Sequence, residues 1–322
     1  MKTARTILDS IGNTPMVRLQ RLARDIDAEV LVKVEYLNPS GSVKDRVALR
    51  MIRDAERDGR LKKGMEIIEA TTGNMGAALA FVGAACGYPL TMYVPKSVLS
   101  EERIRLCRAY GAKVVRVDIE DVIHDSTFPQ GVHGSRVELI PRRVCLQREK
   151  TDKNVWWARQ FSNPSNRLAH KEWTGAEILE QTDGRLDVFV AALGTGGTFL
   201  GVAEALREAN TGAKAVAVEP EGHRTIVDGK LTLPLIEGVS GGLMKELVDR
   251  QMADDVMAVT EEDAIRTAHE LAEQEGLFCG LSSGANVYAA LQIAKTLKKG
   301  QRVVTILVDS RDRYLFTERL TT

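Results

Sequence analysis

The sequence predicts an α/β protein in which mostly parallel sheets are covered by helices on both faces. Two observations lead to this fold class. Short apolar runs rich in β-branched residues alternate with longer segments whose apolar residues recur at helical spacing. Polar, glycine-containing loops follow directly on two of these runs, at the place where open α/β sheets bind ligands. With 322 residues and 44% hydrophobic content, the chain can bury the core of one or two such domains.

Composition narrows the class of partner. The chain has 44 basic and 44 acidic residues, so its charge favours neither nucleic acid nor an anionic membrane. The four cysteines form no CxxC pair and the five histidines lack ligand-like spacing, which predicts reduced thiols and no metal site. No apolar run is long enough to span a bilayer, and no signal-peptide core follows the first residues. We therefore expect a cytoplasmic protein that acts on a small molecule.

Lys44 stands in an unusual position. The strand-like residues 30–34 are followed by Pro39 and Gly41, which end the strand, and by Ser42, a good helix N-cap. Residues 46–52 repeat apolar side chains at helical spacing, so Lys44 falls in the first helical turn. A cation there opposes the helix dipole, so the amine is either solvated, which is the commoner case, or held neutral in a covalent bond.

The same patterns assign elements to the rest of the chain. Residues 11–19 predict a turn that leads into a strand, residues 125–131 predict an irregular loop, and Pro141 predicts a kink or break in a helix. Residues 277–286 predict a turn that enters a helix of small residues, and capping is the simplest role for its serines. Further strands are predicted over residues 66–70, 90–94, 113–117, 155–161, 187–193, 215–219 and 303–308, and helices over residues 77–82, 100–110, 174–179 and 199–209.

Two loops carry the candidate ligand site. Residues 71–76, Thr-Thr-Gly-Asn-Met-Gly, follow the strand at 66–70. Residues 194–198, Gly-Thr-Gly-Gly-Thr, follow the strand at 187–193, and their N–H groups and hydroxyls can converge on a phosphate at a helix N-terminus. Tight turns are the alternative role for such glycines. The loop is neither a P-loop nor a dinucleotide fingerprint, because no Lys-Ser/Thr follows and Phe199 stands where the third glycine belongs.

From residue 7 to residue 315 the sequence resembles the cysteine synthase and cystathionine β-synthase family, and it is most similar to the O-acetylserine sulfhydrylases. Six motifs carry the resemblance and occur in the family's order, at residues 38–46, 71–76, 160–164, 194–198, 280–284 and 309–315. The resemblance implies a homodimeric pyridoxal-phosphate enzyme with the two-domain tryptophan-synthase-β-like fold. It implies a smaller, mobile domain over residues 39–160 that carries the substrate-carboxylate loop. Residues 1–38 and 161–322 would form the larger domain, which binds the cofactor phosphate.

The resemblance also implies a reaction and a role for each motif residue. The reaction is β-replacement on an O-activated L-serine through an α-aminoacrylate, with O-acetyl-L-serine and sulfide giving L-cysteine and acetate. Lys44 would bind the cofactor as a Schiff base and move the α-proton. Ser282 would face the pyridine nitrogen, where a hydroxyl favours β-elimination over transamination. Asn74 would bond the phenolic oxygen, Gly194, Thr195, Gly196, Gly197 and Thr198 would hold the phosphate, and Thr71, Thr72, Met75 and Gln160 occupy the positions that bind the substrate.

Several departures keep alternatives open. Met75 replaces a hydroxyl that commonly contacts the substrate carboxylate, and Val308 and Arg311 stand where proline and glycine are usual. Residues 119–130 form a longer region than in a plain cysteine synthase. Met75 and residues 131–138 are similar to a sister branch that joins phosphoserine to a nitrogen nucleophile, as in N-(2-amino-2-carboxyethyl)-L-glutamate synthesis. Gly196 and residues 237–242 are more similar to the sulfhydrylases.

A phosphoserine donor would need cationic partners such as Arg224, Lys245 or Arg311. A non-catalytic scaffold of the same fold is the third alternative, and Met75 and Arg311 would be the marks of its degraded site.

Overall fold

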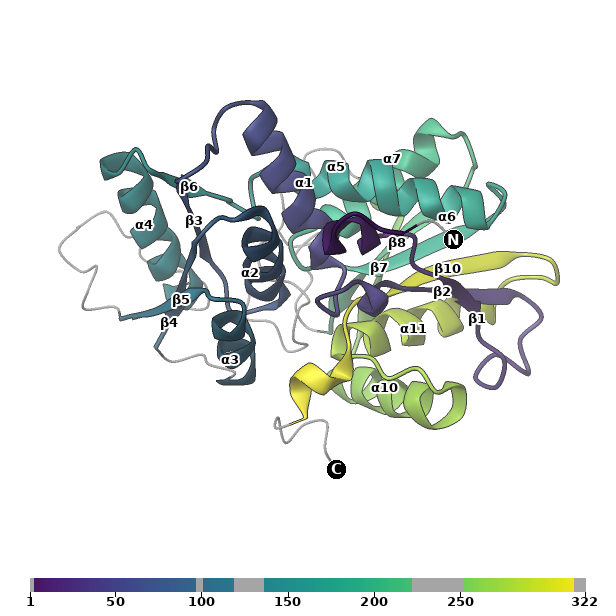
Figure 1. Cartoon of the computed structure of the whole chain (residues 1–322). Coiled ribbons are helices and arrows are strands. Elements are labelled where there is room, and N and C mark those ends of the chain that lie inside the picture. Colours follow the sequence, from purple (N-terminus) through teal and green to yellow (C-terminus); the bar gives the residue numbers. More distant parts are fainter. Residues whose placement is uncertain (1–2, 97–100, 119–135, 222–251, 316–322) are drawn as a thin grey trace. The chain divides into compact units, whose positions relative to one another are not determined.

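The structure is a computed structural model of the chain, and it describes residues 3–96, 101–118, 136–221 and 252–315 (Figure 1). The chain divides into two compact units, one formed by Met1–Asp9 and Lys44–Ser165 and the other by Ser10–Val43 and Asn166–Thr322. The predicted domain boundaries lie at residues 38/39 and 160/161. In the structure the chain passes from one unit to the other after residues 9, 43 and 165.

The first unit is built on a four-stranded parallel sheet. Along the sheet the strands are β5 (Lys113–Val117), β4 (Leu90–Pro95), β3 (Glu66–Ala70) and β6 (Val155–Trp157), and the helices are α1 (Lys44–Arg57), α2 (Asn74–Cys86), α3 (Glu101–Ala109) and α4 (Arg136–Thr151). Ile68 and Tyr93 pack with α4, while Met92 lies on the opposite face, 3.8 Å from the sulfur of Cys107 in α3. Helices therefore cover both faces, as alternation along the strands requires (Figure 1).

The second unit is built on a six-stranded sheet. Its strands in spatial order are β1 (Met16–Arg18), β2 (Glu29–Val34), β10 (Arg302–Leu307), β7 (Val188–Ala192), β8 (Lys214–Pro220) and β9 (Asp255–Val259), and β1 pairs antiparallel with β2 while the other described pairs are parallel. The helices are α6 (Ala176–Gln181), α7 (Gly197–Glu208), α10 (Glu261–Glu275) and α11 (Leu281–Ala294), and short 3-10 turns are η2 (Glu35–Leu37) and η4 (Arg311–Tyr314). A further 3-10 turn, η1 (Ile7–Ser10), lies where the chain passes from the first unit to the second.

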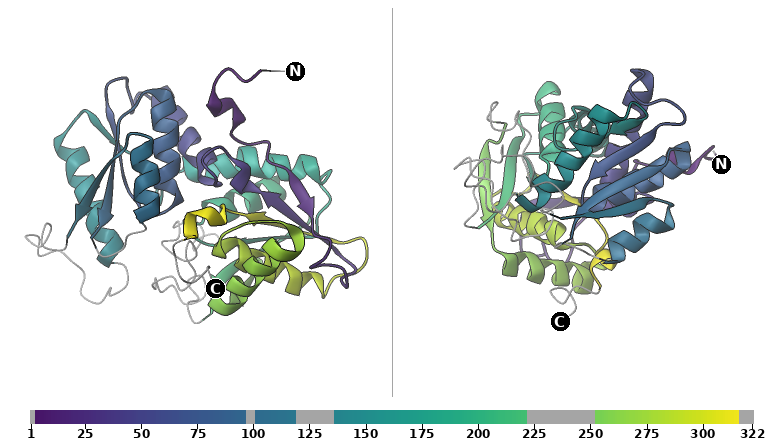
Figure 2. Two further views of the ribbon diagram at one scale, coloured as in Figure 1. Left: turned by 60° about the horizontal axis from the view of Figure 1, so that its bottom comes forward. Right: turned by 90° about the vertical axis from the view of Figure 1, so that its left-hand side faces the viewer.

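Alternate residues of β7 face two separate apolar cores. Val188 and Val190 pack with α10 and α11, whereas Phe189 and Ala191 pack with α6 and α7. Both views in Figure 2 show α10 and α11, in yellow-green, side by side. The predicted α/β class with mostly parallel sheets and helices on both faces is confirmed.

Three predicted elements differ from the structure. The strand predicted over residues 155–161 ends at Trp157, and the break predicted at Pro141 is absent because α4 continues through it. A proline removes a single N–H from the helical ladder, and the helix continues for more than two turns beyond it. The helix predicted from residue 174 begins earlier, as α5 (Ser165–Ala169) followed by a π-helical segment, η3 (His170–Gly175), and α6.

Within the described ranges, 3–96, 101–118, 136–221 and 252–315, no helix combines the length and the apolar character needed to cross a membrane.

Candidate active site

Lys44 is the first residue of α1 and follows a segment that is fixed to the end of β10. The N–H of Val43 donates to the carbonyl of Val308 at 2.9 Å, and Ser42 pairs with Asp309 in an isolated antiparallel bridge. Lys44 is partly buried, in contrast to a fully solvated surface lysine. Its predicted place in the first helical turn is confirmed.

The loop after β3 turns directly into α2, which begins at Asn74, three residues before the predicted start. The hydroxyl oxygen of Thr71 accepts the N–H of Gly73 at 3.2 Å, and the carbonyl of Thr72 accepts a hydrogen bond of 3.4 Å from Arg103 in α3. Asn74 therefore lies in the first turn of α2, where N–H groups are not used by the helix itself. This segment presents hydroxyls, an amide and backbone N–H groups at the carboxyl end of a parallel strand, which suits an anionic group.

Gly76 is required by a close approach between α2 and β4. A Cβ built on Gly76 would lie 2.2 Å from the sulfur of Met92, so any side chain at this position would displace the strand residue. Met75 is 1% exposed and is among the most deeply buried large side chains. Its side chain therefore belongs to the packing of the first unit and offers no hydroxyl to a substrate.

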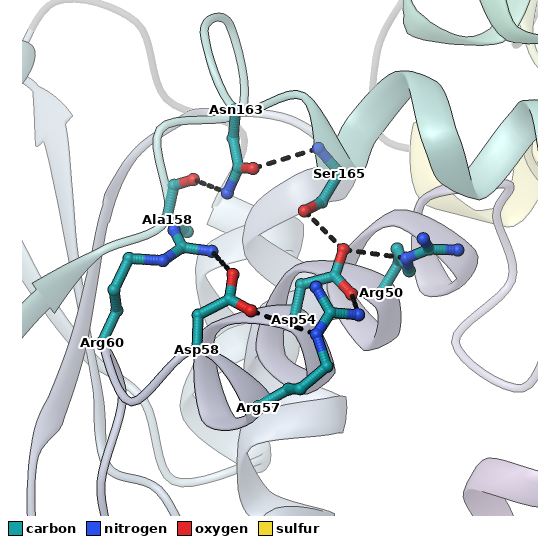
Figure 3. A network of polar contacts seen from close by, with 8 residues as sticks. All are labelled: Arg50, Asp54, Arg57, Asp58, Arg60, Ala158, Asn163 and Ser165. Atoms are coloured by element: carbon teal, nitrogen blue, oxygen red, sulfur yellow. Dashed lines mark hydrogen bonds and ion pairs between the residues drawn. The ribbon is translucent and has the colours of Figure 1, made fainter.

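Gln160 lies just beyond β6 in the same unit. Its backbone N–H donates to the carboxylate of Glu69, the fourth residue of β3, at 2.9 Å, and Gln160 is almost fully buried. The next turn is fixed by Asn163, whose side-chain N–H group donates to the carbonyl of Ala158 at 2.9 Å and whose side-chain oxygen accepts the N–H of Ser165 at 3.1 Å (Figure 3). An asparagine in this role starts a helix, which explains why α5 begins at Ser165.

The glycine-rich loop of the second unit joins β7 to α7. The hydroxyl oxygen of Thr195 accepts two hydrogen bonds, from the N–H of Gly197 at 3.3 Å and from the side chain of Asn166 at 3.0 Å. Because a hydroxyl has two acceptor positions and one O–H, the O–H of Thr195 is left as a donor. Gly196 caps α7 with φ = +83°, and a Cβ on Gly197 would lie 2.1 Å from the Asn166 oxygen. Both positions therefore require glycine.

Thr198 is held by a buried histidine. Its hydroxyl lies 3.2 Å from Nε2 of His170, and Nδ1 of His170 lies 3.1 Å from the hydroxyl of Thr174. His170 begins the π-helical segment η3, a local geometry that is frequent at functional sites. In the tautomer whose Nδ1 accepts from Thr174, Nε2 donates to Thr198 and the O–H of Thr198 can turn toward a ligand, whereas in the other tautomer Nε2 accepts that O–H.

Ser282 is the second residue of α11 and is 5% exposed. Gly280 is the N-cap of this helix, so the role of Ser282 is not that of an N-cap side chain. A Cβ on Gly280 would lie 2.4 Å from an oxygen of Asp309, and the N–H of Gly280 donates to the Asp309 carbonyl at 3.1 Å. The hydroxyl of Ser283 accepts the N–H of Val308 at 2.9 Å. The two predicted motifs at residues 280–284 and 309–315 are therefore in contact with each other.

Sequence reasoning missed several polar residues that hold these segments. Asn286 is fully buried in α11; its side-chain oxygen accepts the N–H of Ala192 at 2.7 Å, and its N–H group donates to the Ile306 carbonyl at 2.8 Å. It thereby fixes the end of β7, two residues before the glycine-rich loop. The signal that could have found it, and Glu69 as well, is a polar residue beside apolar neighbours, since such residues are buried only with partners. The sequence around His170, with Lys171 and Glu172 next to it, carries no such signal.

The departures at Met75 and Arg311 are both accommodated by packing. Arg311 is 3% exposed, donates to the Ala268 carbonyl at 3.3 Å, contacts the ring nitrogens of His269, and stacks its guanidinium 5.5 Å from the Phe278 ring centre. Burial lowers the pKa of His269, and the charge of Arg311 lowers it further, so this histidine is neutral beside the guanidinium. The predicted features at Arg224, Lys245, residues 119–135 and residues 237–242 lie outside the described residues.

The structure brings the predicted site residues together in two sets, one in each unit. Lys44, Thr71, Thr72, Asn74, Met75 and Gln160 belong to the first unit, and Ser282 belongs to the second with Gly194, Thr195, Gly196, Gly197 and Thr198. The second set fits a phosphate, because its backbone N–H groups, two threonine hydroxyls and the N-terminus of a twelve-residue helix are all donors or partial positive charges.

Comparisons with known proteins agree with this chemistry. A family model described as "Pyridoxal-phosphate dependent enzyme" matches residues 7–309. The chain is 38% identical over 317 residues to a cysteine synthase of Staphylococcus aureus (strain Mu50 / ATCC 700699), covering 98% of this chain and 97% of that protein.

Two solved structures share the fold. O-acetyl serine sulfhydrylase isoform 3 from Entamoeba histolytica aligns with a TM-score of 0.87 at 35% identity, covering 100% of this chain and 92% of its own. An O-ureido-L-serine synthase aligns with a TM-score of 0.86 at 39% identity, covering 99% of this chain and 95% of that protein's chain. The resemblance seen in the six motifs is confirmed, and the chain belongs to the family of pyridoxal-phosphate dependent enzymes.

Proposed function

We propose that this enzyme catalyses β-replacement on O-acetyl-L-serine, with sulfide as the nucleophile and L-cysteine and acetate as products. The observation that carries the proposal is the similarity to a cysteine synthase over 98% of the chain. Lys44, the proposed cofactor lysine, lies at the start of α1. In the reaction the acetate leaves the β-carbon with the bonding electron pair, the α-proton moves to a base, and hydrosulfide then adds to the β-carbon as a proton returns to Cα. The reaction therefore needs no oxidant or reductant.

The residues of the first unit hold the substrate and move its proton. Bound pyridoxal phosphate supplies the electron withdrawal that makes the α-proton acidic. Lys44 would hold the cofactor through its amine, and the same amine, once free, would take the α-proton of the amino acid and later return it. Thr71, Thr72 and Gln160 would hold the substrate carboxylate through hydroxyl and amide groups, and Asn74 would hold the cofactor through its phenolic oxygen.

The residues of the second unit hold the cofactor. Thr195 and Thr198 donate their hydroxyls to the phosphate together with the backbone N–H groups of residues 194–198. Ser282 would face the pyridine nitrogen. A hydroxyl does not keep that nitrogen protonated as a carboxylate would, so departure of the β-substituent is favoured over transamination.

The donor is acetylserine and not phosphoserine. The dianionic phosphate of phosphoserine needs cationic partners. The guanidinium of Arg311, one of the three candidates, is engaged with Ala268 and His269 of α10, which supports the neutral acetyl ester.

A second candidate function is β-replacement by a nucleophile other than sulfide. Two observations favour it: Met75 leaves the substrate loop one hydroxyl short, and an O-ureido-L-serine synthase is 39% identical to this chain. Both candidates share the first half of the reaction and differ in the molecule that attacks the β-carbon.

Three further features are proposed from the family resemblance. The enzyme forms a homodimer, it is cytoplasmic, and its smaller domain over residues 39–160 moves when the amino acid binds, which shields the reacting carbon from water. Sedimentation of the purified enzyme tests the dimer. X-ray scattering with and without a bound amino acid tests the movement, which is excluded if the two profiles are identical.

The donor half is tested by adding acetylserine or phosphoserine to the purified enzyme without a nucleophile. The proposal predicts that acetylserine changes the visible absorption of the cofactor and releases acetate, whereas phosphoserine changes the absorption little and releases little phosphate. If neither ester changes the absorption of a cofactor-loaded enzyme, the β-replacement proposal is wrong.

A further inference from the structure

A buried carboxylate joins the two segments to which the substrate carboxylate is assigned. Glu69 is 1% exposed, and both of its oxygens are engaged. One oxygen accepts the N–H of Ala70 at 2.8 Å and the indole N–H of Trp157 at 2.9 Å. The other accepts the backbone N–H of Gln160 at 2.9 Å. All three donors are N–H groups, which can only donate, so each requires an acceptor on Glu69.

The position of Glu69 in the sheet explains how it reaches both segments. Strand β6 pairs in parallel with β3, with Trp157 opposite Ile68, and the N–H of Ala158 donates to the Ile68 carbonyl at 3.1 Å. The chain then leaves the sheet through Arg159, which adopts φ = +57°. The next N–H is that of Gln160, and Glu69 accepts it at the point where the ladder has ended. The left-handed conformation of Arg159 interrupts the extended chain, so the strand predicted over residues 155–161 does not continue to Gln160.

The carboxyl group of Glu69 is buried among hydrogen-bond donors. Burial raises the pKa of Glu69, and the N–H groups of Trp157, Gln160 and Ala70 and the charge of Arg142 offset only part of this rise. A glutamine of the same shape would turn an NH₂ group toward at least one of these donors, because its side chain has a single oxygen. The site therefore selects a carboxylate over an amide.

We propose that Glu69 is a positioning residue for substrate binding, which fixes Gln160 relative to Thr71 and Thr72 so that the three can hold one substrate carboxylate. The inference rests on the proposed function, because the carboxylate-binding role of these three residues does. Ala70 and Gln160 lie at the two ends of the bridge. Ala70 directly precedes Thr71, so one side chain sets the spacing of the whole binding group.

The test compares Glu69→Gln with Trp157→Phe in the cofactor-loaded enzyme. The Glu69→Gln change is expected to raise KM for acetylserine about tenfold while kcat stays within about threefold, because the lost contact affects binding of the carboxylate and not the reacting atoms. Hydrogen exchange of the Gln160 N–H is expected to become faster, and thermal unfolding to remain cooperative. Trp157→Phe removes one donor to Glu69 but leaves the Gln160 bond, so KM is expected to stay within about twofold.

Each outcome decides the proposal. A Glu69→Gln enzyme with wild-type KM and wild-type exchange at Gln160 overturns it, and so does an equal loss of kcat and cofactor in both variants, which indicates a structural role. If Glu69→Gln does not fold, Glu69→Asp keeps the charge but withdraws it by one methylene, and the same KM and exchange measurements apply to it. A wild-type enzyme that does not respond to acetylserine overturns the proposed function and this inference together, whereas failure of the variants alone overturns only the role of Glu69.

Discussion

The carboxylate of Asp54 accepts a hydrogen bond of 2.7 Å from the hydroxyl of Ser165, 111 residues further along the chain. Arg50 and Arg57 donate to the same carboxylate, each at 2.8 Å (Figure 3). Asp54 lies on α1, the helix that begins at Lys44, and Ser165 is the last residue of the first unit. One buried carboxylate therefore fixes the helix that starts with the proposed catalytic lysine to the place where the chain leaves that unit.

Replacing Asp54 by Asn is expected to lower the free energy of unfolding by about 1–3 kcal/mol, because two guanidinium groups and a buried hydroxyl lose a charged acceptor. Asp58→Asn is the matched control. Asp58 pairs with Arg57 and Arg60 on the surface, where ion pairs contribute little, so a much smaller change is expected. Urea unfolding of both variants measures these changes. An equal decrease in the free energy of unfolding in the two variants would show that the Asp54 contacts stabilise the fold no more than the surface ion pairs of Asp58.

The Asp54 contacts also predict a pH dependence. Burial alone would raise the pKa of Asp54, but hydrogen bonds from Arg50 and Ser165 and the charges of Arg50 and Arg57 together lower it below its ordinary value of 3.8. A lowered pKa in the folded state stabilises the fold above the unfolded pKa, and this stabilisation is lost as the pH falls below 3.8. The difference in unfolding free energy between wild type and Asp54→Asn is therefore expected to be constant from about pH 5 to pH 7 and to shrink in more acidic buffer. A difference that grows on acidification contradicts this assignment.

Thr198→Val is expected to weaken cofactor binding about tenfold, because it removes a hydroxyl of the proposed phosphate site that lies 3.2 Å from Nε2 of His170. Thr198→Ser keeps the hydroxyl and serves as the control. Cofactor affinity is measured by titrating the apoenzyme with pyridoxal phosphate. If the Val and Ser variants bind equally well, the Thr198 hydroxyl does not contact the phosphate.

The fold could be predicted well where apolar strands are continuous. Strands β2, β3, β7 and β10 are short, β-branched and buried, and each was predicted to within about two residues. Strand β9 and helix α10 were not predicted. Strand β9 contains a short apolar run at residues 256–259, of which only Val259 is buried, and this run was overlooked. Helix α10 has a clear capping signal, since Thr260 accepts the N–H of Asp263 at 3.0 Å, and this signal was overlooked.

The candidate site could be predicted only in part, for a physical reason. Loops that follow strands are visible in the sequence as glycines, threonines and serines, and the structure has them where they were predicted. The residues that support the loops are distant in sequence, as the contact of Asn286 with Ala192 illustrates, 94 residues apart. A buried polar side chain shows in the sequence that a partner exists, but the choice of partner depends on how the strands are ordered in the sheet.

Lys44→Ala is expected to abolish covalent attachment of the cofactor. Borohydride fixes a cofactor that is bound through a carbon–nitrogen double bond, so the treated wild type should carry the added mass on the peptide that contains Lys44. Lys63→Ala, at an exposed lysine of the same unit, is the control and should be labelled like the wild type. Labelling of the Lys44→Ala protein at another lysine, such as the buried Lys33, would show that the assignment is wrong.

The central claim is that sulfide replaces the acetyl group of O-acetyl-L-serine. The most direct test incubates the cofactor-loaded enzyme with acetylserine and offers sulfide or an amino-acid amine in separate reactions, with mass spectrometry of the products. The account predicts L-cysteine and acetate in equal amounts with sulfide, and little product with the amine. Consumption of acetylserine with the amine but no L-cysteine with sulfide would contradict it and assign the enzyme to the branch that uses nitrogen nucleophiles.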